Sequence, residues 1–157
     1  MTAAEISATE ATASGRSVAI VAARFNDLIV ASLLKGARER WIERGGASEE
    51  LLVVRVPGAF ELPVVARRLA GSGRYDAIVA LGCVIRGDTP HFEYVAGECA
   101  RGLQLVSLET GVPVIFGVLT VDDREQARDR LGGHEGHKGE EAASTAIEMV
   151  SLLRTLP

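Results

Sequence analysis

Side chains that could bind or transform a small molecule follow three apolar runs of this sequence. They comprise aromatic rings, a carboxylate, arginines and a histidine, which can stack on a planar ligand, hold an anion and move a proton. Each group stands directly after a run dense in Val, Ile, Leu and Ala. The groups are residues 24–26 after the run at 17–23, residues 57–61 after the run at 51–56, and residues 86–91 after the run at 77–85.

His91 is the candidate for proton transfer. Thr89 and Pro90 precede it, and a capping hydroxyl followed by a proline at the first helical position favours a helix start. The positive end of the helix dipole would disfavour the imidazolium form and keep a neutral base near pH 7. A surface histidine beside an ordinary cap would have the same local sequence, so that interpretation stays open. Phe25 likewise could stack on a planar ligand or fill the core.

Arg130 and Lys138 are candidates for binding a phosphate. They flank or lie in the glycine-rich segment 132–139 (GGHEGHKG), which we expect to be a mobile or ligand-fitting loop. Two cations beside backbone amides that can turn inward suit a phosphate, which arginine binds through two parallel hydrogen bonds. Solvated basic residues that complete a helix terminus are the alternative interpretation.

The glycine-rich segment does not predict a metal or nucleotide site. His134, Glu135 and His137 lie within four residues of a flexible loop, which fixes no coordination geometry, so we expect no bound metal. The run at 17–23 is not followed by GxGxxG, and GGHEGHKG does not fit GxxxxGK[ST]. Neither a dinucleotide nor a P-loop nucleotide is therefore expected as a ligand.

Composition narrows the class of protein further. The 157 residues suit one domain, and 47% hydrophobic residues, 24% charged residues and a net charge of -4 argue against disorder and against nucleic-acid binding. Cys83 and Cys99 have neither CxxC partners nor metal-ligand spacing and are interpreted as reduced, buried thiols. No apolar stretch approaches a membrane span and no signal peptide is present, so we expect a soluble, cytoplasmic protein.

Four apolar runs predict buried strands, at 17–23, 51–56, 77–85 and 114–121. Helical patterns separate them, and the order β-α-β-α-β-α-β-α-α predicts a parallel α/β sheet with helices on both faces. Residues 1–15 are poor in large apolar side chains, so we expect a mobile or extended segment that cannot pack a core, followed by one domain at 16–157.

Local signals predict where the helices begin and end. We expect Asn26 to cap a first helix that stops at Gly45 and Gly46, and a second helix to follow Phe60. A third helix should begin at Pro90 and end by Gly111. A capping box of Asp122 and Glu125 predicts a short helix that ends at Gly132, and the last helix has the apolar face Ala143, Ile147 and Val150. Because a ligand crevice lies beyond the carboxyl ends of parallel strands, the residues after the strands should meet there.

From about residue 17 to 155, the order and spacing of the sequence motifs resemble those of the 6,7-dimethyl-8-ribityllumazine synthases. The segments that carry the resemblance are RFND at 24–27, VPGAFELP at 56–63, ALGCVIRGDTPHFEYV at 80–95, PVIFGVLT at 113–120, EQA at 125–127 followed by Arg130, and KG at 138–139. The resemblance implies a three-layer αβα sandwich with a four-stranded parallel sheet of flavodoxin-like topology.

The resemblance also implies a reaction without a cofactor, in which 5-amino-6-(D-ribitylamino)uracil and L-3,4-dihydroxy-2-butanone 4-phosphate give 6,7-dimethyl-8-ribityllumazine, phosphate and water. This is the penultimate step of riboflavin biosynthesis. Carried over by position, His91 would transfer protons. Substrate binding would fall to Phe25, Ala59, Glu61, the backbone of Cys83, Val84 and Ile85, and, from the adjacent subunit, Phe116, Arg130 and Lys138.

The implied assembly is a homopentamer with active sites between subunits. A sixty-subunit icosahedral shell stays open, since the loop has no insertion but reads GGHEG where capsid-forming relatives often carry a lysine. Two other functions also stay open. One is riboflavin synthase of the related archaeal type, which lacks a phosphorylated substrate, and the other is a flavin or lumazine carrier, which would not need His91.

Overall fold

A computed structural model of the protein describes residues 3–157. Its centre is a four-stranded sheet in which every pairing is parallel, with the strand order β2-β1-β3-β4. The strands confirm the four predicted runs, and their order is that of a flavodoxin-like fold. They are β1 (Val18–Ala23), β2 (Leu51–Val56), β3 (Ala77–Ile85) and β4 (Val114–Val121).

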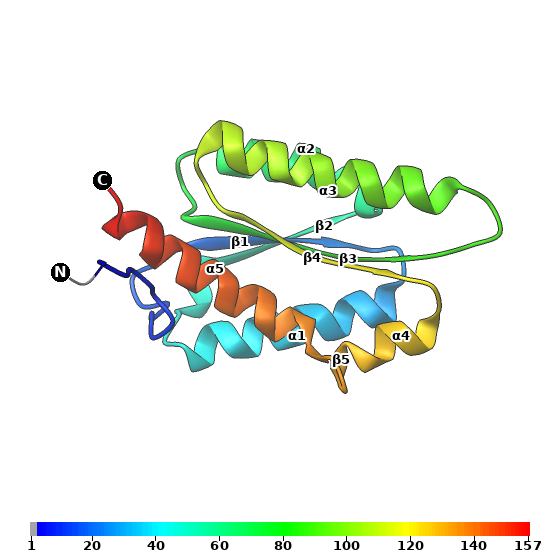
Figure 1. Ribbon diagram of the computed structural model, residues 1–157, viewed down its shortest axis with the longest axis horizontal. Helices are drawn as coiled ribbons and strands as arrows, with labels where there is room; N and C mark the ends of the chain where they lie inside the picture. Colours follow the sequence, from blue (N-terminus) through cyan, green and yellow to red (C-terminus); the bar gives the residue numbers. More distant parts are fainter. Residues whose placement is uncertain (1–2) are drawn as a thin grey trace.

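Helices cover both faces of this sheet, which explains why the central strands are apolar throughout. All six residues of β1 and eight of the nine in β3 are buried. Helices α2 (Leu62–Ala70) and α3 (His91–Thr110) lie on one face, and α1 (Asp27–Glu43), α4 (Arg124–Asp129) and α5 (Lys138–Thr155) lie on the other (Figure 1). The predicted three-layer sandwich is confirmed. Within residues 3–157, no helix has the length and apolar character needed to cross a membrane.

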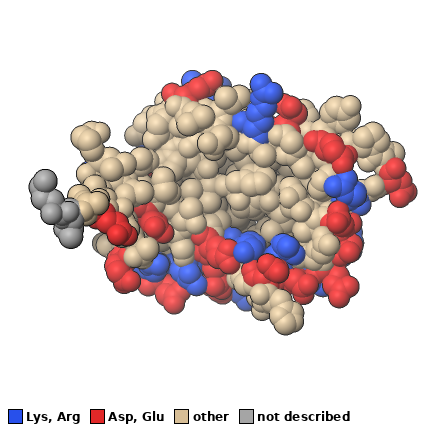
Figure 2. All heavy atoms as spheres, in the orientation of Figure 1, with Lys and Arg blue, Asp and Glu red and all other residues tan. Residues whose placement is uncertain are grey.

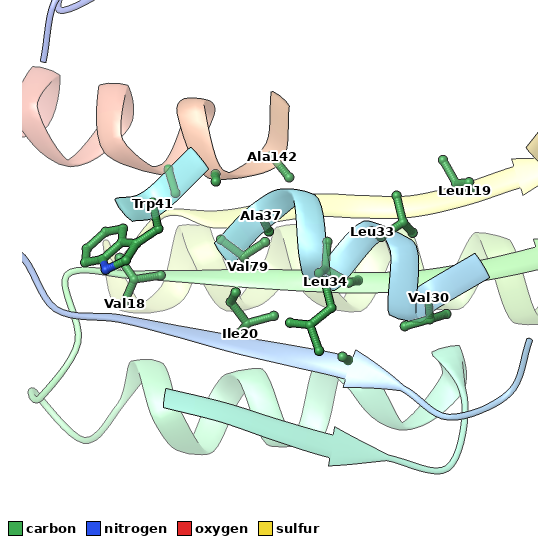
Figure 3. Close-up of a cluster of buried hydrophobic side chains, with 14 of the residues drawn as sticks. Val18, Ile20, Val30, Leu33, Leu34, Ala37, Trp41, Val79, Leu119 and Ala142 are labelled. Carbon is green, nitrogen blue, oxygen red and sulfur yellow. The ribbon is translucent and has the colours of Figure 1, made fainter. Parts of the chain in front are cut away.

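The core on the α1 and α5 side is built around Trp41. This ring and Leu33, both from α1, belong to one cluster with Ile20 and Val79 of the central strands (Figure 3). The indole Nε1 donates to the carbonyl of Ala47 at 2.9 Å, so the polar atom of the buried ring has a partner. On the other face, a second cluster joins the same sheet to α2 and α3.

Part of the predicted N-terminal extension belongs to the Trp41 cluster. Ala13 is 0% exposed, and its N–H donates to the carbonyl of Arg44 at 2.9 Å. The Arg44 guanidinium donates in turn to the carbonyl of Ala11 at 2.5 Å. The expectation that residues 1–15 cannot pack a core is wrong here, because a small side chain and backbone hydrogen bonds suffice. Residues 1 and 2 of the predicted extension lie outside the described residues.

Two predicted helix caps differ in the structure. Asn26 occupies the N-cap position of α1 as predicted, but its side chain does not cap the helix: its φ is 60° and its Nδ2 donates to the carbonyl of Cys83 at 2.8 Å. The cap of α4 is Asp123, whose carboxylate accepts the N–H of Gln126 at 2.9 Å, one residue after the predicted Asp122. Adjacent carboxylates offer the same local signal, and the path of the chain decides between them.

The glycine-rich segment 132–139, for which we predicted a mobile or ligand-fitting loop, forms part of a hairpin and the start of a helix. Strands β5 (Leu131–Gly133) and β6 (Gly136–His137) pair antiparallel as a short hairpin, and Lys138 begins α5. Helix α4 ends at Asp129, three residues before the predicted end. Two glycines of the hairpin have φ of 103° and 72°, so the glycine content serves a turn in the left-handed region.

Glycine allows α5 to begin in close contact with α1. A Cβ on Gly139 would lie 2.1 Å from the carbonyl oxygen of Leu33, which is backbone of α1. A Cβ on Gly36 of α1 would lie 2.2 Å from the ring of His137. The close packing of α5 against α1, and with it the position of Lys138, therefore requires glycine at both 36 and 139.

We expect Gly139→Ala to lower the free energy of unfolding by roughly 1–3 kcal/mol, because backbone must move to admit the methyl group. Gly97→Ala is the matched control, because Gly97 also lies within a helix, α3. A Cβ at this position would have no atom of another described segment within 4 Å. Its free energy of unfolding should stay the same or rise by up to ~1 kcal/mol. Urea titration of both variants at one protein concentration makes the comparison, and equal stabilities would contradict the assigned contact.

Candidate active site

The carboxyl ends of β1, β2 and β3 border a cavity of about 770 Å³. Its wall is mainly apolar with a few polar side chains, which is typical of a site for a small organic ligand. Seven of the ten predicted site residues line this cavity, hereafter the strand-end cavity. They are Phe25, Ala59, Glu61, Cys83, Val84, Ile85 and His91.

The connection from β1 to α1 presents Phe25 at the strand-end cavity. The Phe25 residue is 73% exposed, so its ring does not fill the core. Its N–H donates to the carbonyl of Pro57 at 3.0 Å, and the neighbouring Asn26 is tied to the carbonyl of Cys83. These two bonds join the connection to the ends of β2 and β3. Of the two interpretations of Phe25, stacking on a ligand is the one that its exposure favours.

A 3₁₀ turn, η2 (Ala59–Glu61), forms a second part of the wall. Ala59 is buried, whereas Glu61 is exposed and precedes the first residue of α2. A Cβ on Gly58 would lie 3.2 Å from Oε2 of Glu61, so the missing side chain leaves room for this carboxylate. The turn therefore offers a carboxylate acceptor to a hydroxylated ligand.

His91 is the first residue of α3 and is exposed at the same cavity. The helix begins one residue later than predicted, with Pro90 at the N-cap position, where it supplies no capping side chain. The Thr89 hydroxyl accepts the N–H of His91 at 3.4 Å, which is a weak contact. The imidazole thus stands at a helix N-terminus beside the ligand space, where a proton shuttle could act.

A second cavity, of about 600 Å³, runs along the edge strand β4 beside α5. It contains the other three predicted residues, Phe116, Arg130 and Lys138. Phe116 is 45% exposed, and Arg130 donates from Nη1 to the carbonyl of Gln126 at 2.9 Å. We call this space the edge-strand cavity. Two cations and an exposed ring give it the means to hold an anionic ligand.

The strand-end and edge-strand cavities share no lining residue. The structure therefore brings seven of the predicted residues together in one place and three in another. Arg130 and Lys138 therefore do not line the strand-end cavity of their own chain.

Comparison with known families adds the decisive observation. The sequence model described as 6,7-dimethyl-8-ribityllumazine synthase matches residues 15–154, which is nearly the whole chain. The chain belongs to the 6,7-dimethyl-8-ribityllumazine synthase family. As a lumazine synthase it is a transferase of riboflavin biosynthesis, and it condenses 5-amino-6-(D-ribitylamino)uracil with L-3,4-dihydroxy-2-butanone 4-phosphate.

The geometry suits a lumazine synthase reaction, which needs a planar pyrimidine, a polyhydroxylated ribityl chain and a phosphate to be held at once. The strand-end cavity offers the exposed ring of Phe25 and the carboxylate of Glu61, and the edge-strand cavity offers Arg130 and Lys138. Among residues 3–157, no cluster of three or more His, Cys, Asp or Glu side chains could hold a metal ion.

Several lining residues were not among the predicted site residues. Phe92 and Val95, which are one and four residues after His91 in α3, line the strand-end cavity, and Glu141 and Thr145 line the edge-strand cavity. The signal for Glu141 was its position three residues after Lys138, whose Nζ it binds at 2.8 Å. Glu141 therefore compensates part of the positive charge in the edge-strand cavity.

The Cys83 thiol beside the strand-end cavity is not a nucleophile at neutral pH. Burial raises its pKa to about 11, with Arg124 opposing the shift in part, and burial also raises the pKa of Cys99 to about 11. Both cysteines are free and buried. Because the thiolate is the reactive form, the site works without covalent catalysis by sulfur.

Alkylation of single-cysteine variants tests this assignment. In Cys99→Ala, the rate of Cys83 alkylation should rise with pH toward a midpoint near 11 in the folded protein and near 8.5 in urea. The free energy of unfolding should be highest below about pH 8.5 and fall toward pH 11, since the folded state holds the thiol proton more tightly. A midpoint near 8 in the folded protein would contradict the assignment.

Proposed function

We propose that the strand-end cavity binds the ribitylaminopyrimidine and carries the proton transfers. Phe25 stacks on the pyrimidine, Ala59 and Glu61 contact the ribityl chain, and the backbone of residues 83–85 binds the ring. His91 moves the protons. The proposal is supported by the common location of these residues around one cavity and by the exposure of Phe25 and His91.

We propose further that each site is completed by a neighbouring copy of the chain. Phe116, Arg130 and Lys138 of that copy form the part of the site that binds the ketose phosphate. The observation that carries this proposal is the division of the ten residues between two cavities without a common lining residue. The reaction joins both substrates, so their binding groups must meet, and a second chain brings them together.

The surface supports an assembly of this kind. Figure 2 shows a face whose middle, between α3 and α5, is hollowed and largely uncharged, with charged side chains gathered around its rim. Phe60 at the strand-end cavity and Phe116 at the edge-strand cavity are large exposed apolar residues. Leu28 and Tyr94, in the first turns of α1 and α3, are exposed as well. An apolar centre with a polar rim is the usual composition of a subunit interface.

A head-to-tail interface of this type closes into a ring when the rotation between neighbours divides a full turn. Five copies are the number that the family resemblance implies, and a sixty-subunit shell would be built from twelve such rings. Cytoplasmic location agrees with two free, buried thiols.

The chemistry assigned to these residues is modest, because both substrates bring their own reactivity. The amino group of the pyrimidine condenses with the ketose carbonyl and releases one water, phosphate is then eliminated, and the second ring closes with loss of a second water. Holding the substrates in register supplies proximity, His91 supplies acid-base catalysis, and Arg130 with Lys138 neutralises the departing phosphate. A turnover assay with both substrates tests this function, since a carrier would bind the pyrimidine without forming lumazine.

We expect His91→Ala to lower kcat roughly a hundredfold, the usual contribution of general acid-base catalysis, while pyrimidine binding stays nearly intact. Steady-state kinetics and a binding titration with the pyrimidine measure the two quantities. A variant with unchanged kcat would remove His91 from the mechanism.

Mixing two inactive variants tests whether the site is shared. We mix equal amounts of the His91→Ala and Arg130→Ala proteins, dissociate them together and let the rings reassemble. Each site takes its histidine from one chain and its arginine from the next, and each of these is intact with a probability of about one half. About a quarter of the sites, and so about a quarter of wild-type activity, should therefore return. Sites within one chain would regain none. Rings purified through two different tags confirm exchange, and doubly tagged rings no more active than the parents would contradict the shared site.

A further inference from the structure

Arg86, at the end of β3, has three side-chain partners that the proposed mechanism does not use. Its Nε donates to Oδ1 of Asp122 at 2.9 Å, and its Nη1 donates to the carboxylate of Glu93. The central carbon of its guanidinium lies 4.3 Å from the ring centroid of Phe92, which is cation-π distance. One planar group thus joins residues from two other segments of the chain.

Two of these partners belong to the first turn of α3. Phe92 and Glu93 directly follow His91, the residue to which we assign proton transfer. This turn has no side-chain cap, since Pro90 is at the N-cap position. Its local hydrogen bonds are the one from the Glu93 N–H to the Pro90 carbonyl at 3.1 Å and the 3.4 Å contact from the His91 N–H to the Thr89 hydroxyl. A helix end without a capping side chain frays unless other contacts hold it.

The remaining contacts of Arg86 anchor it to the sheet. Its backbone N–H donates to the carbonyl of Val121, the last residue of β4, at 2.9 Å. Asp122 follows Val121, and its own N–H donates to the side-chain oxygen of Gln126 in α4 at 2.8 Å. The arginine is therefore fixed on one side by the strand ends and holds the start of α3 on the other.

We propose that Arg86 is a positioning residue that sets the place of the His91 imidazole by clamping Phe92 and Glu93. The inference rests on the proposed role of His91 and extends it. Arg86 acts through the helix turn and is not assigned a contact with substrate. Phe92 also lines the strand-end cavity, so the same clamp sets one part of the wall.

Arginine is suited to this task and lysine is not. The guanidinium is a planar fork that donates to two carboxylates while its face lies on a ring, whereas an ammonium group offers a single charge centre. The hydrogen bond from Arg86 lowers the pKa of Glu93, so this carboxylate stays ionised at the pH of any ordinary assay. The clamp thus stays charged under assay conditions.

A double-mutant cycle on kcat tests the proposal in the assembled enzyme with both substrates. Arg86→Ala should lower kcat about tenfold, and Arg86→Lys should recover only part of that loss. In the His91→Ala background the same Arg86→Ala change should lower kcat by less than about twofold, because the group being positioned is gone. Loss of general structure would instead lower kcat by the same factor in both backgrounds.

Arg154→Ala is the matched control. Arg154 donates to Asp76 at 3.0 Å, so this variant also deletes an exposed arginine-carboxylate pair, at the opposite end of the sheet just before β3. Its kcat should equal that of the wild type. Thermal unfolding and native mass of every variant show whether fold and assembly are kept. If an Arg86 variant does not fold, Glu93→Gln, which removes the charge and keeps the shape, takes its place in the cycle.

The outcomes separate the two claims. An unchanged kcat in Arg86→Ala, or equal losses in both backgrounds, overturns the positioning role and leaves the role of His91 intact. A His91→Ala protein with full activity refutes the proposed function of His91 and this inference with it. The clamp is supported if Arg86→Ala lowers kcat strongly in the wild-type background and only slightly in the His91→Ala background. Arg86→Lys should then restore only part of the lost kcat.

Discussion

Parallel pairing of four buried strands is the constraint on which this active site depends. Parallel neighbours cannot be joined by a tight turn, so each connection must cross a face of the sheet as a helix and return to the same edge. All strands therefore finish together, and the register brings the end of β1 beside the end of β2 and the end of β3 beside the end of β4. Phe25, the η2 turn and His91 meet because they follow strands that end at one place.

The same constraint places Arg130 and Lys138 in a different cavity from His91 within one chain. Strand β4 is at the edge of the sheet, and the chain continues from it through α4 and the hairpin into α5 on the face opposite α3. The close contact of α5 with α1 through Gly139 holds Lys138 on that side. Within one chain, Arg130 and Lys138 therefore stay on the side of the sheet that α4 and α5 cover, whereas His91 begins α3 on the other side.

The chemistry that remains for the protein is alignment. Burial raises the pKa of the thiol near the cavity, and the reactive groups belong to the substrates, so the protein contributes mainly by holding groups in place. Contacts within the protein, such as Asn26 with Cys83 and Arg86 with Glu93, serve this alignment. The first joins the residues after β1 to β3, and the second joins the residue after β3 to the first turn of α3.

The sequence by itself determined the four strands, the helices between them and the edge at which the candidate residues gather. Those features follow from apolar runs, helical periodicity and the position of residues after strands, all of which are local patterns. The family resemblance, carried by segments in fixed order, added the reaction. Only the tertiary structure decided that Asn26 binds Cys83 rather than capping α1, that Ala13 joins the core, and that the glycine-rich segment is a hairpin. It also decided that ten candidate residues divide between two cavities. For Asn26, Ala13 and the two cavities, the deciding partners lie far away in the chain, and no local pattern encodes a contact between such distant residues. The hairpin pairs residues close in sequence, but its glycines allow many backbone conformations, so the local pattern did not select the hairpin.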